Sequence, residues 1–223
     1  GTGANGMVAS DDSMAVNCGS VATSGTGSFL MWATADPGEI HTGPTPPSAA
    51  LSHGMVATEG STATNTGDIT TSGAGAYGMF ADTNSEIYNI GADSIVTTGD
   101  GSHGMVAVNV SSADNSGSIT TSGAGSYGML AENSSFATNS GTITTSGIGS
   151  HGMVASADSV AESEGIIVTT GADAFGMKAE DGSAVANSGI ITTSGTGSHG
   201  MAVFGASTGT NDGIIGTSGT SAW

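Results

Sequence analysis

Four histidines recur at nearly regular intervals in this sequence, and they are the side chains best suited to chemistry. His53, His103, His151 and His199 each stand two residues before a Met. Imidazole nitrogens bind Zn²⁺, and they also gain or lose a proton near neutral pH. The column therefore indicates one of three elements: a metal site, a pH-sensitive row, or a stack of rings with a structural role.

Carboxylates form a second set of candidates. The chain has 19 Asp and Glu residues, with adjacent pairs at Asp11 and Asp12 and at Glu180 and Asp181. Such pairs suit Ca²⁺ binding or the acid and base of glycoside hydrolysis. Most of the acids are scattered, however, and the calcium-binding repeat Gly-Gly-x-Gly-x-Asp is absent. We expect a solvated acidic surface without a cofactor, with a Ca²⁺ site as the alternative.

The composition limits what the elements around these residues can be. The chain has 223 residues, one Lys or Arg, a formal net charge of -18 and 39 glycines. An acidic chain of this kind has no electrostatic affinity for nucleic acid phosphates or anionic membranes. No apolar run approaches the roughly 18 residues of a membrane-spanning helix, so we expect no membrane insertion.

A fixed period organises the whole sequence. Nine of the ten methionines are spaced by 24 residues in seven of eight intervals, and the exception is 26 residues, through a corner insertion near Ala92 and Asp93. Ala, Ser, Asn, Gly and an aliphatic residue recur at fixed offsets from each Met. The methionine column consists of Met7, Met31, Met55, Met79, Met105, Met129, Met153, Met177 and Met201.

This period predicts an all-β parallel β-helix, or β-solenoid, of about nine 24-residue coils. Several glycines per unit and many Thr, Val and Ile residues disfavour helices and favour short strands between turns. A unit of about 24 residues matches one coil, with each strand stacked about 4.8 Å from its counterpart in the next coil. We expect a single domain over 1–223. All four prolines fall in the second unit, so an irregular coil that bulges or loops out is predicted at about 30–52.

Identical side chains are predicted to stack in rows inside this solenoid. Buried Met and Ile rows would stabilise it, stacked Asn amides would hydrogen-bond along its axis, and the variable residues after each Met would face outward. The predicted rows include Met55, Met79, Met105, Met129, Met153, Met177, Asn65, Asn115 and Asn139.

The histidine column alternates with aromatic residues on this scheme, as in His53, Tyr77, His103 and Tyr127. Successive histidines are then two coils, roughly 9.6 Å, apart. Because Zn–N bonds are about 2.0–2.1 Å long, two such histidines do not share one ion. We therefore favour a stacked ladder of imidazoles and aromatic rings, and keep a pH-sensitive ladder as the alternative.

Three further groups carry weaker hypotheses. Parallel β-helices include polysaccharide lyases, which use a basic residue to remove a proton, but the only basic residue, Lys178, falls in a variable outward column. Cys18 lies beside Asn17 without a catalytic pattern. Outward Thr and Ser pairs, such as Thr120 with Ser122, resemble the flat surfaces of ice-binding solenoids. We predict that the chain is not an enzyme.

The phrases GSHGMVA at 101–107 and NSGTITTSG at 139–147 resemble the β-helix repeats of bacterial autotransporter passenger domains. The resemblance covers nearly the whole chain and weakens in the Pro-rich unit. It implies export, an extracellular or cell-surface location, and a role as an adhesin or stalk. No catalytic residue of that family maps onto this chain.

These observations together predict a non-enzymatic extracellular structural protein: a surface fibre or adhesin stalk that associates with itself. The chain spans almost a whole number of coils from Gly1 to Trp223, and exposed end coils invite end-to-end stacking at these residues. A host or matrix glycan or protein is a further expected partner. A carbohydrate-binding or carbohydrate-processing β-helix is the alternative.

Overall fold

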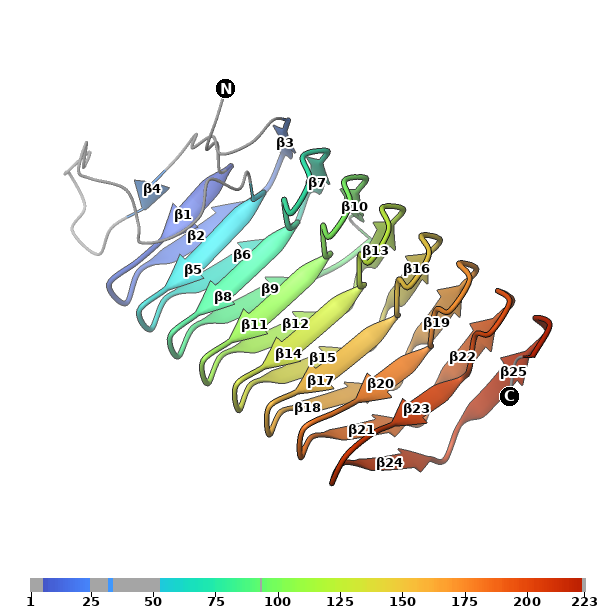
Figure 1. Ribbon diagram of the computed structural model, residues 1–223. Helices are drawn as coiled ribbons and strands as arrows, with labels where there is room; N and C mark the ends of the chain where they lie inside the picture. Colours follow the sequence, from blue (N-terminus) through green and yellow to red (C-terminus); the bar gives the residue numbers. More distant parts are fainter. Residues whose placement is uncertain (1–5, 25–31, 34–52, 93, 222–223) are drawn as a thin grey trace.

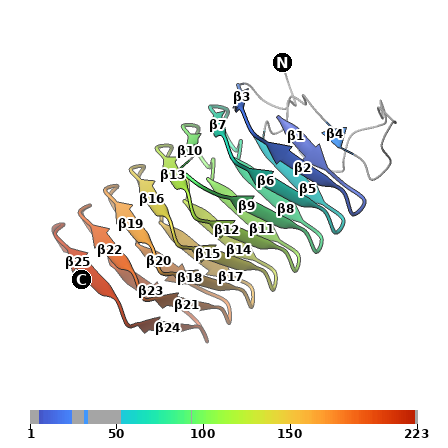
Figure 2. The same ribbon diagram turned by 180° about the vertical axis from the view of Figure 1, so that it is seen from behind.

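The computed structural model describes residues 6–24, 32–33, 53–92 and 94–221. These residues form only strands, turns and bends, and the strands stack along one axis into a β-solenoid (Figure 1). The strands β1 and β25 lie at opposite ends of the stack (Figure 2). Within the described residues, no helix is long and apolar enough to cross a membrane. The predicted fold class is therefore confirmed.

Three parallel sheets form the walls of the solenoid, and each complete coil gives one strand to each sheet. The first, here called the Met sheet, has nine strands. In spatial order they are β4 (Trp32–Ala33), β1 (Met7–Ala9), β5 (Met55–Thr58), β8 (Met79–Asp82), β11 (Met105–Val108), β14 (Met129–Glu132), β17 (Met153–Ser156), β20 (Met177–Ala179) and β23 (Met201–Val203).

The other two sheets have eight strands each among the described residues. The Asn sheet contains β2 (Met14–Asn17), β6 (Thr62–Asn65), β9 (Glu86–Asn89), β12 (Ser112–Asn115), β15 (Phe136–Asn139), β18 (Val160–Ser163), β21 (Ala184–Asn187) and β24 (Thr208–Asn211). The Ile sheet contains β3 (Ser20–Thr23), β7 (Asp68–Thr71), β10 (Ser94–Thr97), β13 (Ser118–Thr121), β16 (Thr142–Thr145), β19 (Ile166–Thr169), β22 (Ile190–Thr193) and β25 (Ile214–Thr217).

The number of coils differs from the prediction. Eight complete three-stranded coils are described, not nine, because β1 pairs directly with β5 and places Met7 beside Met55. The second unit is therefore not inserted between them, and its strand β4 pairs with the other edge of β1. Four prolines explain this exclusion, since proline has no N–H to donate to a sheet. The prolines themselves, and Met31, lie outside the described residues.

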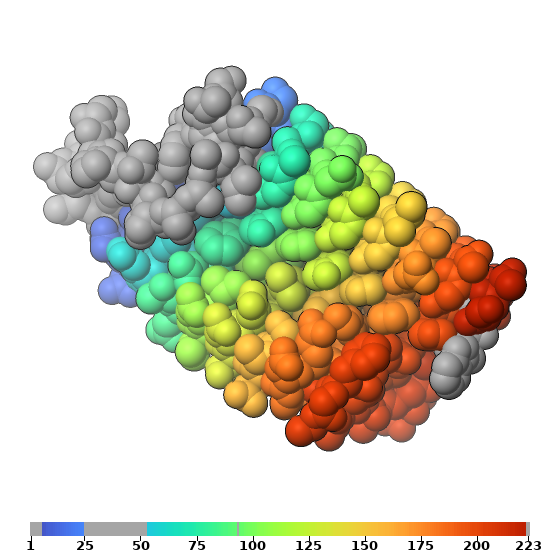
Figure 3. Space-filling view, in the orientation of Figure 1, coloured from blue at the N-terminus to red at the C-terminus, as the bar shows by residue number. Residues whose placement is uncertain are grey.

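The insertion of two residues in the fourth unit leaves the stack in register. Ile95 pairs with both Ile69 and Ile119, although 26 residues separate it from the first and 24 from the second. Ala92 is exposed at a corner between strands, and Asp93 lies outside the described residues. In the space-filling view, the successive coils appear as bands of colour that follow one another from one end of the molecule to the other (Figure 3).

Candidate functional site

Two rows of large aliphatic side chains, together with smaller Ala rows, fill the interior of the solenoid. Met55, Met79 and Met105 pair in register and are fully buried. Three further methionines of the predicted row, Met129, Met153 and Met177, continue the same pattern. An Ile row faces them from the Ile sheet, again with no exposed surface from Ile69 to Ile191. Each such side chain contributes about 1.5–3 kcal/mol of burial free energy, so these rows are the core of the molecule.

An amide row runs along the inner edge of the Asn sheet. Nδ2 of Asn65 donates to Oδ1 of Asn89 at 2.8 Å, and the same contact links Asn89 to Asn115 and Asn115 to Asn139. The row is interrupted at Ser163, whose Oγ accepts a bond of 3.2 Å from Asn139. Beyond it, Oδ1 of Asn187 is buried and accepts no hydrogen bond within the described part of the chain.

The histidine column forms one continuous stack of rings with the aromatic residues between. Ring centroids lie 4.7 Å apart for His53 and Tyr77, 5.0 Å for Tyr77 and His103, and 4.6 Å for His103 and Tyr127. The stack continues through His151 to Phe175 and His199. Each inner imidazole therefore lies between two aromatic rings. This arrangement serves packing and gives two histidines no opportunity to share a metal ion.

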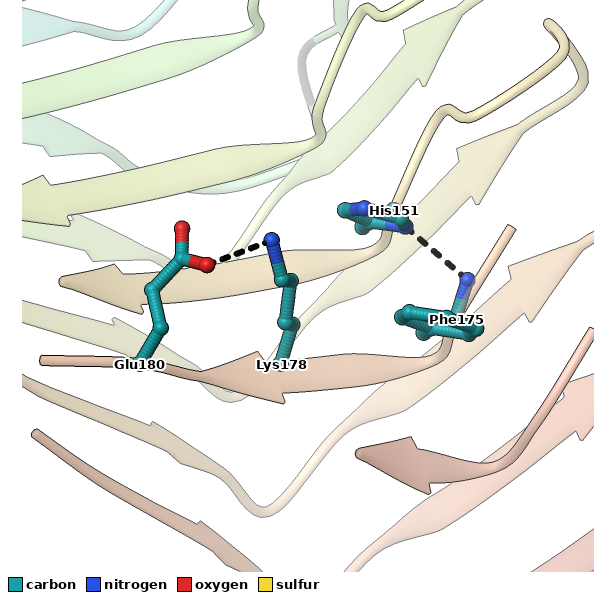
Figure 4. Close-up of polar contacts among 4 residues, drawn as sticks. All are labelled: His151, Phe175, Lys178 and Glu180. Atoms are coloured by element: carbon teal, nitrogen blue, oxygen red, sulfur yellow. Dashed lines mark hydrogen bonds and ion pairs between the residues drawn. The ribbon is translucent and has the colours of Figure 1, made fainter. Parts of the chain in front are cut away.

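Each of three histidines also accepts a hydrogen bond from the next coil. Nδ1 of His151 accepts from the backbone N–H of Phe175 at 3.0 Å (Figure 4), and His53 and His103 make the equivalent bonds. Burial lowers the pKa of His53 and of His103 to about 4. For His151, burial and the nearby charge of Lys178 together lower the pKa to about 4. These imidazoles are neutral at physiological pH.

The residues that follow each Met point outward, as predicted, but several of them are not exposed. Val8, Val56, Val106 and Val154 are at most 4% exposed. The rings of the histidine stack lie on this outer face of the Met sheet, as the stacking of Phe80 on His53 at 5.4 Å demonstrates. These outward side chains are covered because the ring stack forms a second apolar layer outside the sheet.

The one basic side chain is engaged on the Met sheet. Nζ of Lys178 lies 2.7 Å from Oε2 of Glu180 (Figure 4). It also lies 5.7 Å from the ring centroid of Phe204. A lyase base must face acidic metal ligands across a substrate groove. No three His, Cys, Asp or Glu side chains are arranged to hold a metal ion in the described ranges. Lys178 is accordingly placed as an ion-pair partner.

The predicted acidic pairs do not form a carboxylate dyad. Asp11 and Asp12 have φ angles of 56° and 59° and occupy a tight corner between the Met and Asn sheets, as does Asp181 at 54°. The pKa of the exposed Glu59 carboxyl is raised by a hydrogen bond with Asp11 and by the charge of Asp11. These residues shape and charge one corner of each coil.

A shallow groove lies along the opposite corner, between the Asn and Ile sheets. One part, of about 260 Å³, is lined by Ile90, Asp114, Asn115, Ser116, Thr138, Asn139, Ser140, Glu162 and Glu164. The adjoining part, of about 170 Å³, is lined by Glu162, Ser163, Glu164, Ala186, Asn187, Ser188, Thr210 and Asp212. We call this surface the corner groove. Its carboxylates and hydroxyls were not singled out by the sequence, because their offsets are shared with ordinary surface positions.

The outward face of the Ile sheet carries the predicted Thr and Ser pairs. Thr70 and Ser72 are exposed, and Thr120 and Thr144 are half-buried in the same row. From Ser94 to Ile214 the outward positions of this sheet's strands carry no charged residue, and Ile166 and Ile190 are exposed there by 42% and 41%. The described acidic residues therefore lie mainly on the other walls and corners.

The remaining predicted residues have simple positions. Cys18 is a free, exposed thiol at a corner next to the buried Asn17. Gly1 and Trp223, the residues expected to form end-to-end contacts, lie outside the described residues.

Comparison with known proteins gives one family. The model of the BigA third pectate lyase-like domain matches residues 1–92 and residues 82–220. No curated protein matches, and no solved structure matches. The two overlapping matches fit a chain built from one repeated coil, and together they span nearly all of it. The chain therefore belongs to the family of the BigA third pectate lyase-like domain.

Proposed function

We propose that this chain is a non-enzymatic structural segment displayed outside the cell, as the stalk of a surface adhesin or fibre. The observation that carries the proposal is the uninterrupted pairing of eight coils through three parallel sheets with a filled interior. Seven steps of about 4.8 Å make a rod of roughly 34 Å. A rod of this kind separates its two ends by a fixed distance, which is the task of a stalk.

The position of the one lysine, away from the corner groove, supports a role without catalysis. Proton removal from a polysaccharide requires a base within hydrogen-bond reach of the substrate. Lys178 lies on the Met sheet in an ion pair with Glu180, whereas the corner groove lies on the far side of the Asn sheet. The carboxylates of the groove also repel a polyanion such as pectate.

Surface display is supported by two sequence features. The repeats resemble autotransporter passenger domains, which are exported and displayed, and the family belongs to the pectate lyase-like β-helices. A high negative charge and one free cysteine suit an exported rod that needs no disulfide framework. We expect an extracellular or cell-surface location on these grounds.

The alternative is a carbohydrate-binding or carbohydrate-processing β-helix. The observation that favours it is the corner groove, whose hydroxyls and carboxylates are able to hydrogen-bond a sugar. The lining residues include no aromatic ring, and the ring of Tyr88, which pairs in register with Asp114, adjoins the groove without lining it, so a sugar in the groove has little surface on which to stack. This function is therefore ranked second.

End-to-end association is a further part of the proposal. Ile215 on β25 is 36% exposed, whereas its neighbour Ile191 one coil earlier is fully buried. A further coil stacked on β25 would cover this surface and pair the open strand edge. The next repeat of a longer polypeptide or the first coil of a second copy could supply that coil, and for the purified 223-residue chain we propose a second copy.

Three measurements test the proposed function. Negative-stain electron microscopy of the purified chain is expected to show short rods that lengthen with concentration. Incubation with polygalacturonate and Ca²⁺ is expected to give no ultraviolet absorbance from unsaturated products, in the wild type as in K178A. Protease treatment of intact producing cells is expected to remove the chain. Product formation that K178A abolishes would establish a lyase and overturn the proposal.

A further inference from the structure

An exposed isoleucine row lies on the outward face of the Ile sheet. Ile166, Ile190 and Ile214 begin β19, β22 and β25, the last three strands of that sheet, and they pair with one another in register (Figure 1). Their side chains are exposed by 42%, 41% and 64%. Neighbouring strands lie about 4.8 Å apart, so the three side chains form one contiguous apolar patch. Contiguous apolar patches on a protein surface mark interaction sites.

The rest of this face is uncharged, in contrast to the other two walls. From β10 to β25, the two outward positions of each strand carry only Ser, Thr, Val, Ile or Gly. The outward positions of the Asn sheet include Asp114 and Glu162, and those of the Met sheet include Asp82 and Glu132. Because the chain has a net charge of -18, another acidic molecule meets the least repulsion on the Ile sheet.

We propose that this face joins two copies of the chain side by side, with their solenoid axes antiparallel. A second copy presents the same uncharged face, and its side chains recur at the same interval of about 4.8 Å, so the two surfaces interdigitate as paired β-sheets do. A twofold axis that runs along the strands near Ile190 places Ile166 of one copy opposite Ile214 of the other. The parallel arrangement would set the isoleucines against Thr and Ser residues and bury less apolar surface.

The size of the face fits a dimer that dissociates readily. The six strands from β10 to β25 span about 29 Å along the axis, and the outward positions, with the Ser or Thr that follows each strand, span about 20 Å across it. Two copies therefore bury about 1,200 Å² in total. This area is at the lower end of the range for specific protein interfaces. We expect dissociation in the micromolar range, within reach of a concentration series.

Two carboxylates flank the isoleucine row and set the salt dependence of the dimer. Glu164 and Asp212 stand two residues before Ile166 and Ile214, and both are exposed at the corner groove. The antiparallel arrangement brings Glu164 of one copy towards Asp212 of the other at the rim. Like charges repel there, and dissolved salt screens the repulsion. Added salt is therefore expected to tighten the dimer, whereas it would weaken an interface held by ion pairs.

Sedimentation velocity over a concentration series tests the face with two matched variants. I190K places a charge at the centre of the interface and is expected to raise the dimer dissociation constant at least about thirtyfold. F136K makes the same change at an apolar side chain that is 56% exposed on the Asn sheet, and it is expected to leave the dissociation constant unchanged. Thermal unfolding checks that both variants fold. Association of I190K equal to that of the wild type would refute the proposal.

The arrangement is tested through the two rim carboxylates. E164Q/D212S removes both charges, and Ser188 already illustrates serine in this column. The variant is expected to tighten the dimer about threefold at low salt and to lose the salt dependence of the wild type. A wild-type dimer that weakens as salt is added would contradict the antiparallel arrangement.

Lateral pairing is distinguishable from the end-to-end association proposed above, because end-to-end contacts add copies without limit. If end-to-end association fails, the wild type is expected to stop at twice the mass of one chain and I190K to remain a monomer. If lateral pairing fails, I190K grows as the wild type does. A wild-type chain that stays monomeric at every concentration would also overturn the proposal, and its cosedimentation with phosphatidylcholine vesicles would assign the isoleucine row to lipid instead.

Discussion

Nδ1 of His103 accepts a hydrogen bond of 2.9 Å from the backbone N–H of Tyr127 on the following coil. His53 and His151 accept the equivalent bonds at 3.0 Å. An imidazolium has a proton on both nitrogens and accepts no hydrogen bond. The ring stack therefore requires neutral imidazoles with the proton on Nε2.

Acid is expected to destabilise the solenoid before its carboxylates titrate. The folded pKa of about 4 for these three histidines lies below the usual 6.5. Their contribution to stability is therefore complete above pH 6.5 and is lost as the pH falls towards 4. Between pH 7.5 and 5.5 the free energy of unfolding is expected to fall by about 1 kcal/mol per histidine. Urea unfolding at these two pH values measures the change.

A triple variant separates the histidines from all other titrating groups. In H53F/H103F/H151F the rings are kept and the imidazoles are removed, as Phe175 already illustrates in the same column. Its unfolding free energy is expected to be nearly equal at pH 7.5 and 5.5. A wild-type chain that is equally stable at both pH values would contradict the prediction.

Val110 occupies a conformation that β-branched residues avoid. Its φ angle is 67°, and its side chain is 61% exposed, so packing does not offset the backbone strain. The equivalent corner of other coils has Gly60 and Gly182, also at positive φ. V110G is expected to stabilise the fold by about 1 kcal/mol, and G60V to destabilise it by a similar amount. Urea unfolding of both variants checks the opposite signs.

Completing the amide row is expected to stabilise the solenoid. In S163N the new amide would accept from Asn139 and donate to Oδ1 of Asn187, which now has no partner within the described chain. The expected gain is about 1 kcal/mol in the free energy of unfolding. N139S, which opens a second gap beside the first, is the control and is expected to lose about 1–2 kcal/mol. A loss in S163N would show that the gap at Ser163 cannot hold an amide.

A glycine precedes each Met that is stacked in the Met sheet, and the close approach of neighbouring coils requires it. A Cβ on Gly128 would lie 2.6 Å from the carbonyl oxygen of Gly152 and would also collide with Cγ2 of Ile143. G128A is therefore expected to cost about 3 kcal/mol, as overpacking of a core does. A Cβ on Gly216 meets nothing within 4 Å, so G216A is the matched control and is expected to be neutral. Equal unfolding midpoints for the two variants would contradict this explanation.

The sequence predicts the fold because identical residues that recur at one period are buried together when successive repeats stack in register. Met55, Met79 and Met105 recur at nearly constant spacing, and in-register stacking is the only way to bury all of them together. Each amide of the Asn row likewise finds its partner one coil away. Local pattern and long-range contact coincide in a solenoid, which is rare in globular domains.

Other features depend on relationships that a single period does not contain. Met7 pairs directly with Met55, so the second unit is not inserted between them. A 24-residue period alone does not predict this, because it depends on the free-energy cost of placing four prolines in the stack. The burial of Val106 depends on rings that lie across the outer face of the sheet. The corner groove arises from outward residues whose side chains share no repeated type. The one visible signal for it was Ser163 in the Asn column.

β1 pairs directly with β5 and in register, although the second repeat unit lies between them in the sequence. Two coils can therefore stack on each other when the repeat between them does not enter the stack. The chain thus leaves the stack after β3, adds β4 to the outer edge of β1, and re-enters at β5 on the other side of β1. A foreign segment spliced at that exit would be carried on the side of an intact rod, and lengthening or shortening by whole repeats would change reach without redesigning the wall.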